Sequence, residues 1–322
     1  MICYILGIAS PTYSIPASTY YQGWASSSNY VNGNTYYGYK LFVGQHLGGP
    51  LFFTHYSFLG FDPRNKKDRF CNYFIQNRNQ TLINRAYCIA NPRNFVGYDS
   101  LNWGLTASDN PWGYLAHEPY LNDNGTIAPT AALSSMPYTP NESIATLKHF
   151  YRRYFNRLWG TYGFKDAFNL TQNWFANSYL AIDQGPIIIM IENYRTGLLW
   201  NLFMSNPEIQ TALDSIGFVT DTTQTSVELE NNKFENFSTL SVYPNPFNYQ
   251  TEIEFEVHQS GEVKIAIYDL LGREVKVISI EFLNSGKHRF SWKPEINLSS
   301  SIYLLVALQN NRKLVHKLIY LK

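Results

Sequence analysis

The sequence predicts a two-domain protein in which a helical part precedes an all-β part. The chain has 322 residues, enough for two domains. Up to about residue 218 the apolar residues recur at helical spacings, whereas from about residue 240 they alternate with period two in short segments. Residues 219–239 are rich in Thr, Asn, Glu and Ser and hold few large apolar side chains, so we expect a linker there.

Helix signals mark several segments of the first part. Thr139 to Glu142 forms a capping box with Pro140 at the first helical position. The segment that opens at Asp183 is apolar on nearly every side, which is typical of a helix buried among other helices. The expected helices cover residues 65–90, 139–159, 183–200 and 206–217, and long aromatic loops separate them.

The second part carries the signals of a β-sandwich. Apolar residues alternate in short segments, as in Ile253, Phe255 and Val257, and turn residues such as Leu271-Gly272 separate the segments. Short alternating strands at regular spacing predict an all-β sandwich. The expected strands cover residues 251–257, 262–268, 274–280, 288–292, 302–308 and 313–321.

Charge and hydropathy exclude several classes of partner. The formal net charge is +1, so the chain has no electrostatic reason to bind nucleic acid or an anionic membrane. No apolar run reaches the roughly 18 residues needed to span a bilayer. Lys40 is the first charged residue, and the apolar start from Met1 to Ala9 therefore lacks the positive region that a secretory signal requires.

The three cysteines indicate neither a disulfide nor a metal site. Cys71 and Cys88 lie 17 positions apart within one expected helix, or about 25 Å at 1.5 Å per residue, which is too far for a disulfide. No Cys/His group has zinc-binding spacing. We expect small buried hydrophobic side chains, and neither a metal nor a cofactor.

The C-terminal part contains a specific combination of motifs. It opens with Tyr243-Pro244-Asn245-Pro246-Phe247, continues with Tyr268-Asp269-Leu270-Leu271-Gly272-Arg273-Glu274, and ends at Arg312 to Lys322. These residues resemble the type A C-terminal sorting domain of type IX secretion cargo in Bacteroidetes, with Ser301 where the family usually has Gly. The resemblance implies an immunoglobulin-like sandwich over residues 240–322 and the type IX secretion machinery as a partner. A generic immunoglobulin-like spacer is the alternative.

Residues 1–218 resemble the second half of the bacterial glucoamylase-like domain, which is similar to β-1,2-glucanases with an (α/α)6 barrel. The resemblance rests on five strings, which are Tyr4 to Thr12, Asn102 to Asp109, Ala128 to Tyr138, Tyr179 to Pro186 and Ile191 to Gly197. It implies a partial (α/α)6 toroid, because the full family domain is roughly twice as long. It also implies that one catalytic carboxylate precedes Met1.

Four carboxylates are candidates for the acid and base of an inverting glycosidase. That mechanism needs two carboxyl groups about 6.5–9.5 Å apart. Asp183 lies at the start of a buried helix, where catalysis and helix capping are both open interpretations, and Asp109 is the second catalytic candidate, with an Asx turn as its alternative. We expect Asp166 to pair with Arg157, and Glu192 to form a buried pair with Arg195.

Aromatic residues make up 16% of the chain, which indicates either an aromatic-rich core or a sugar-binding cleft. The same two interpretations hold for the candidate sugar platforms and hydrogen-bonding groups. A satisfied core histidine is the commoner outcome for His55. The candidate substrate-binding residues are Trp112, Tyr114, Asn173, Trp174, His55 and Tyr56.

Together these features favour a fragment of a secreted glycoside hydrolase that acts on glucans, with β-glucan as the expected substrate class. The alternatives are a non-catalytic glycan-binding remnant exported by the type IX system and a product that does not fold. We expect the protein at the cell surface or outside the cell, with its signal peptide missing from this chain. The motifs do not identify the glucan linkage.

Overall fold

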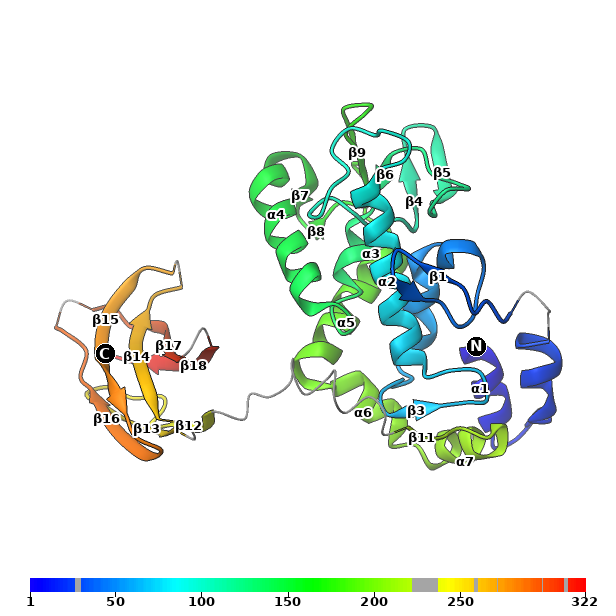
Figure 1. Ribbon diagram of the computed structural model, residues 1–322. Helices are drawn as coiled ribbons and strands as arrows, with labels where there is room; N and C mark the ends of the chain where they lie inside the picture. Colours follow the sequence, from blue (N-terminus) through cyan, green and yellow to red (C-terminus); the bar gives the residue numbers. More distant parts are fainter. Residues whose placement is uncertain (27–29, 222–236, 258–259, 271, 297, 310–311) are drawn as a thin grey trace. The chain divides into compact units, whose positions relative to one another are not determined.

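The computed structural model describes residues 1–26, 30–221, 237–257, 260–270, 272–296, 298–309 and 312–322 (Figure 1). The chain divides into two compact units, Met1–Gln224 and Thr225–Lys322. The first is mainly helical and the second is made of strands. Most of the expected linker, residues 222–236, lies outside the described residues.

The helices of the first unit are α1 (Ile2–Ala9), α2 (Tyr73–Ala90), α3 (Pro129–Leu133), α4 (Pro140–Leu158), α5 (Ala181–Thr196), α6 (Leu198–Met204) and α7 (Pro207–Ile216). Short helical turns occur at η1 (Tyr20–Trp24), η2 (His46–Gly48), η3 (Leu51–Thr54) and η4 (Tyr56–Phe58). The buried α3 packs against both α4 and α5, and α1 packs against α7 (Figure 1).

Short strands connect these helices. They are β1 (Thr35–Tyr36), β2 (Tyr39–Lys40), β3 (Lys66–Lys67), β4 (Ala107–Asn110), β5 (Gly113–Ala116), β6 (Thr126–Ile127), β7 (Trp159–Gly160), β8 (Gly163–Phe164), β9 (Phe168–Asn169), β10 (Trp174–Phe175) and β11 (Val219–Thr220). All of their pairings are antiparallel, and β9 pairs with both β6 and β10.

Helix α2 begins eight residues later than the sequence pattern indicated. The Asn72 side chain accepts hydrogen bonds from the amides of Phe74 and Ile75, which caps the helix at that point. Cys71 therefore lies before the helix, and the expected 65–90 span is wrong at its start. Cys71 and Cys88 are both buried free thiols, as expected of small hydrophobic side chains, whereas Cys3 is exposed and the expectation of burial is wrong for it.

Helix α4 begins at Pro140 as expected, but the capping box does not form. The Thr139 hydroxyl donates to the Ser135 carbonyl at 3.4 Å and lies 3.2 Å from the Ser143 hydroxyl. Its side chain makes no capping hydrogen bond to the helix. Thr139 is buried, and its hydroxyl is engaged by the turn at Ser135 instead of by the first amides of the helix.

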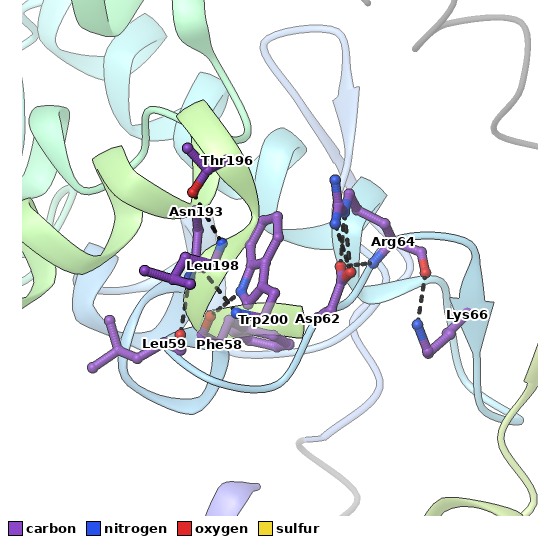
Figure 2. Close-up of polar contacts among 9 residues, drawn as sticks. All are labelled: Phe58, Leu59, Asp62, Arg64, Lys66, Asn193, Thr196, Leu198 and Trp200. Carbon is purple, nitrogen blue, oxygen red and sulfur yellow. Dashed lines mark hydrogen bonds and ion pairs between the residues drawn. The ribbon is translucent and has the colours of Figure 1, made fainter. Parts of the chain in front are cut away.

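The expected helix from Asp183 to Trp200 is two helices that meet at Gly197, whose φ is 70°. Asn193 connects them. Its Oδ1 accepts the Trp200 amide at 3.0 Å, and its Nδ2 donates to the Leu59 carbonyl at 2.9 Å (Figure 2). The Trp200 indole donates to the Phe58 carbonyl at 2.7 Å. The break therefore has a defined geometry set by buried polar contacts.

Helix α5 is not buried on all sides. Asp183, Pro186, Met190 and Asn193 are buried, whereas Ile182 is 58% exposed and Ile188 is 70% exposed. The expectation of burial all round is wrong, because only one face of this helix packs against the described residues of its unit.

The first residues of the expected linker belong to the helical unit. Strand β11 pairs with β3, with Val219 opposite Lys67 and Thr220 opposite Lys66. The buried Asp221 carboxylate accepts from Asn72 at 3.1 Å and lies 3.5 Å from the Lys67 ammonium. Local composition gave no sign of this long-range pairing.

The second unit consists of two antiparallel sheets. One has the strand order β12-β13-β16 and the other β15-β14-β17-β18. Alternating side chains of both sheets share one core, which includes Phe255, Ile265, Trp292 and Leu305. The strands are β12 (Phe237–Tyr243), β13 (Thr251–Val257), β14 (Gly261–Tyr268), β15 (Glu274–Leu283), β16 (Gly286–Trp292), β17 (Ser301–Gln309) and β18 (Arg312–Tyr320).

Candidate active site

The first turn of α5 carries a buried carboxylate. Asp183 is the third residue of the helix and is 2% exposed. Leu180 occupies the N-cap, so the interpretation of Asp183 as the helix cap is wrong. The Thr130 hydroxyl donates to the Asp183 carbonyl at 2.8 Å and ties this turn to α3. Pro186 lies inside the helix, where it has no N–H to donate to the carbonyl of Ile182.

Two further carboxylates meet Asp183. The Asp109 amide in β4 donates to Asp166 Oδ2 at 2.7 Å. The Asp166 carboxyl in turn interacts directly with the Asp183 carboxyl. A strand, a loop and a helix start that are far apart in the sequence therefore bring three acidic side chains into one cluster. We call Asp109, Asp166 and Asp183 the carboxylate cluster.

The cluster favours a bound proton. The pKa of Asp183 is raised to about 8, first by burial and then by the Asp166 and Asp109 carboxyls, while the Tyr56 hydroxyl lowers it. Burial also raises the pKa of Asp166. With both groups ionised, Asp166 Oδ1 and Asp183 Oδ2 have no hydrogen-bond donor among the described residues. One proton between these two carboxyls would satisfy both atoms.

Two tyrosines border the carboxylate cluster. Tyr56 is half-buried in η4, and its pKa is raised by burial and by the Asp183 charge. Tyr114 lies directly across the β4–β5 pair from Asp109 and is 55% exposed. Burial and the charge of Asp183 raise its pKa. Both rings thus lie within electrostatic reach of the acid groups.

The β4–β5 hairpin also presents Trp112, which is 66% exposed. The Asn110 side chain accepts the Trp112 amide at 2.9 Å and shapes this tight turn. One hairpin therefore carries Asp109, Trp112 and Tyr114, which are three of the predicted site residues. Apolar sugar faces and exposed aromatic rings are complementary surfaces, so the hairpin is suited to hold a glycan beside the acids.

The other candidate residues have different surroundings. His55 is 1% exposed, its Nε2 is 2.9 Å from the Ser135 hydroxyl, and burial lowers its pKa to about 3. His55 therefore has the environment of a core histidine, which was the alternative to a substrate-binding role. Asn173 accepts from Arg157 at 2.6 Å, and Trp174 is half-buried in β10.

Two of the expected charge pairings need correction. Arg157 does not contact Asp166. It donates to Asn173 and lies 3.9 Å from the Phe175 ring centre, because the β9–β10 hairpin folds over α4. Glu192 and Arg195 do pair at 3.1 Å, but the Arg195 side chain is 65% exposed, so this pair is not buried.

Asp166 is the site residue that sequence reasoning assigned to a different role. It lies in the loop between β8 and β9, and no sequence motif beside it indicates a catalytic acid. Its position depends on a contact with Asp109, 57 residues away in the chain. Among the described residues, no group of three or more His, Cys, Asp and Glu side chains has the arrangement of a metal site.

In the second unit, the Tyr-Pro-Asn-Pro-Phe motif joins the last strand. Asn245 Oδ1 accepts the Ile319 amide at 2.8 Å, and its Nδ2 donates to the Lys317 carbonyl at 2.7 Å. Phe247 is buried against Trp292 and Tyr320, whereas Tyr243, Pro244 and Pro246 are exposed. The motif therefore fixes β18 to the beginning of the unit.

The second motif forms a closed turn. Gly272 has a φ of 79°, a left-handed conformation that favours glycine. The Arg273 guanidinium and backbone amide both donate to the Asp269 carboxylate, at 2.6 and 2.9 Å. Arg273 is itself largely exposed, so the turn presents a charged pair at the surface.

The helical unit thus combines a cluster of acidic side chains with exposed aromatic rings, and comparison with known families identifies its class. Residues 1–207 match the family described as "Putative glucoamylase", and residues 241–321 match the secretion system C-terminal sorting domain. The chain belongs to this glucoamylase-like family and ends in a sorting domain.

Particular relatives have narrower descriptions. The exo-β-1,2-glucooligosaccharide sophorohydrolase (non-reducing end) of Parabacteroides distasonis is 50% identical, over 67% of this chain and 32% of the relative. The endo-β-1,2-glucanase of Chitinophaga pinensis, solved with sophorotriose and glucose, is 51% identical with a TM-score of 0.66 over 67% of this chain and 53% of that one.

A solved Bacteroides uniformis protein described as a "putative glucoamylase" is 60% identical, with the same TM-score and the same coverage of each chain. The present chain thus spans about half the length of these solved relatives and about a third of the curated one.

Proposed function

We propose that the helical unit is part of a hydrolase of β-1,2-glucans. The carboxylate cluster carries this proposal, because a glycosidase needs a carboxyl group that remains protonated at neutral pH and Asp183 has a pKa raised to about 8. The relatives named for β-1,2-glucans and their oligosaccharides supply the substrate class. The exposed rings of Trp112 and Tyr114 support a glycan path beside the acids.

The proposed mechanism is inversion, with Asp183 as the acid that protonates the leaving oxygen. The two carboxyls of an inverting pair lie about 6.5–9.5 Å apart to leave room for water. Asp166 interacts directly with Asp183, so these two do not form such a pair. The base is then Asp109 or a carboxylate from another part of the family domain. We favour the latter, since the chain spans 53% of its solved relatives.

The finer architecture belongs to the same proposal. We infer that the helical unit forms half of an (α/α)6 toroid, and that the two sheets form an immunoglobulin-like sandwich. The exposed apolar side chains of α5 and α6 support the first inference, since Ile188, Leu198 and Leu202 are 70%, 47% and 58% exposed. Clustered exposed apolar side chains of this kind usually mark a packing surface.

The sorting domain supports export by the type IX system to the cell surface or beyond. In this proposal the partners are the glucan and the secretion machinery. Across the described residues, no helix is both long and apolar enough to cross a bilayer. Tyr243 and Arg273 are exposed members of the two motifs and are candidates for contact with the machinery.

The test is the release of reducing sugar from linear β-1,2-glucan. We expect no turnover by the 322-residue chain, and turnover by a longer protein in which the first half of the family domain precedes it. In that longer protein Asp183→Asn should lower kcat by about 10²–10⁴-fold, the usual contribution of an acid or base. Asp214→Asn, the same change at an exposed aspartate of α7, is the control and should leave kcat unchanged.

Three outcomes would contradict the proposal. Robust hydrolysis by the 322-residue chain would refute the site shared with another part of the domain. Full activity of the Asp183→Asn variant would remove Asp183 from the mechanism. Binding of glucan without hydrolysis by the longer protein would favour a glycan-binding domain instead.

A further inference from the structure

Ser178 links two members of the carboxylate cluster. It lies between β10 and α5, and its hydroxyl donates a short hydrogen bond to Asp109 Oδ2. Its backbone carbonyl accepts the Asp166 amide at 3.1 Å. Because the Asp109 amide donates to Asp166 Oδ2 at 2.7 Å, the three residues form a closed ring of hydrogen bonds.

The two carboxylates of the ring have different hydrogen-bond partners. The Asp109 carboxylate accepts the Ser178 hydroxyl on Oδ2. Asp166 receives a backbone amide on Oδ2, while its Oδ1 faces no donor among the described residues. The free acceptor of Asp166 therefore remains available to share a proton with Asp183.

The segment that carries Ser178 is held on both sides. The Ala176 amide donates to the Ala167 carbonyl at 2.9 Å, next to the Asp166 anchor. Farther back, Arg157 binds both the side chain and the carbonyl of Asn173, at 2.6 and 2.7 Å. Ser178 therefore has little freedom to follow a shift of Asp109, and its hydroxyl can act as a fixed point.

We propose that Ser178 is a positioning residue, which holds the Asp109 carboxylate where it favours a proton on the neighbouring Asp166–Asp183 pair. This inference rests on the proposed function of that cluster. The titratable groups that act on the pair are Asp109, Tyr56 and Tyr114, which are all of acidic type. The hydroxyl of Ser178 then sets the position of Asp109, and through it the binding of the proton by Asp166 and Asp183.

The test is a carboxyl ¹³C NMR titration of the 322-residue protein labelled at aspartate. In Ser178→Ala, we expect the Asp183 resonance, whose pKa is raised to about 8 in the wild type, to titrate about one pH unit lower, because the Asp109 carboxylate is no longer held beside it. Ser178→Thr keeps a hydroxyl and should restore the wild-type titration. Should the alanine variant not fold, Ser178→Cys supplies a weaker donor and should shift the resonance in the same direction.

Ser108→Ala is the matched control. The Ser108 hydroxyl donates to the Asp109 backbone carbonyl at 3.1 Å and does not touch the carboxylate. Loss of this hydroxyl should leave the carboxyl titrations unchanged. A wild-type titration in Ser178→Ala, or a shift that threonine does not reverse, would overturn the proposal. The titration needs no turnover, so a failure of glucan hydrolysis with the expected shifts would reject the enzymatic function and leave the positioning role standing.

Discussion

At the scale of the residue, burial shifts the protonation of Asp183 and His55 in opposite directions for the same reason. Removal from water disfavours the charged form of each group. The pKa of the aspartate is therefore raised to about 8, and that of the histidine is lowered to about 3. Both groups are neutral at pH 7, but only Asp183 retains a dissociable proton for chemistry.

The raised pKa of Asp183 predicts how stability depends on pH. Between about pH 4 and pH 8 the folded state holds a proton that the unfolded state has released, so this group lowers the free energy of unfolding as the pH rises. Asp183→Asn removes that loss. We expect its Tm to equal that of the wild type near pH 4 and to exceed it near pH 8 by at least about 2–4 °C.

The measurement is differential scanning calorimetry of both proteins across that range. The difference between the two Tm values isolates Asp183 together with its coupling to Asp166, because His55 and the titrating groups outside the carboxylate cluster are common to both chains. An equal Tm difference at every pH would show that Asp183 titrates normally in the folded protein.

The sequence predicted some of the site residues and missed others, and the missed ones depend on contacts between residues far apart in the chain. Asp183 was identifiable because it starts an apolar helix, and Asp109 because it ends a motif beside Trp112. The contact of Asp166 with Asp109 spans 57 residues, and no local pattern encodes it. The role of Ser178 is hidden for the same reason, since its partner lies 69 residues away.

At the scale of the element, single polar side chains decide where helices begin and end. Asn72 starts α2, and Asn193 joins α5 to α6. Sequence periodicity predicted the existence of these helices and misplaced their ends, because Asn193 acts through the Trp200 amide and the Leu59 carbonyl rather than through a standard cap. Hydrophobic spacing could not reveal the break at Gly197.

The junction of α5 and α6 gives the second stability prediction. Asn193→Ala leaves the buried Trp200 amide and the Leu59 carbonyl without their partners, so we expect the free energy of unfolding to fall by about 1–3 kcal/mol. Chemical denaturation followed by circular dichroism measures this change. Gln210→Ala removes an exposed side-chain pair with Asp214 on α7 and should cost less than about 0.5 kcal/mol. Equal losses in both variants would show that the junction is not specially stabilised.

At the scale of the whole molecule, the two units have separate cores. The β unit contains its own cluster around Phe255 and Trp292, and its opening motif closes onto its final strand through Asn245. The sequence predicted the order of the units and most strands of the second, because a period of two persists along each strand and survives long-range packing. It misplaced the border of the first unit, where β11 pairs with β3.

Separate cores predict separate unfolding. Phe247 is 4% exposed and packs on Trp292 and Tyr320, so Phe247→Ala should destabilise the β unit by about 3–5 kcal/mol. Phe282→Ala makes the same chemical change at a side chain that is 68% exposed, and should cost less than about 0.5 kcal/mol. In calorimetry of the full chain, we expect Phe247→Ala to lower one transition and to leave the transition of the helical unit in place. A common downward shift of the whole profile would mean that the two units unfold as one, and equal effects of the two substitutions would mean that Phe247 does not anchor the motif.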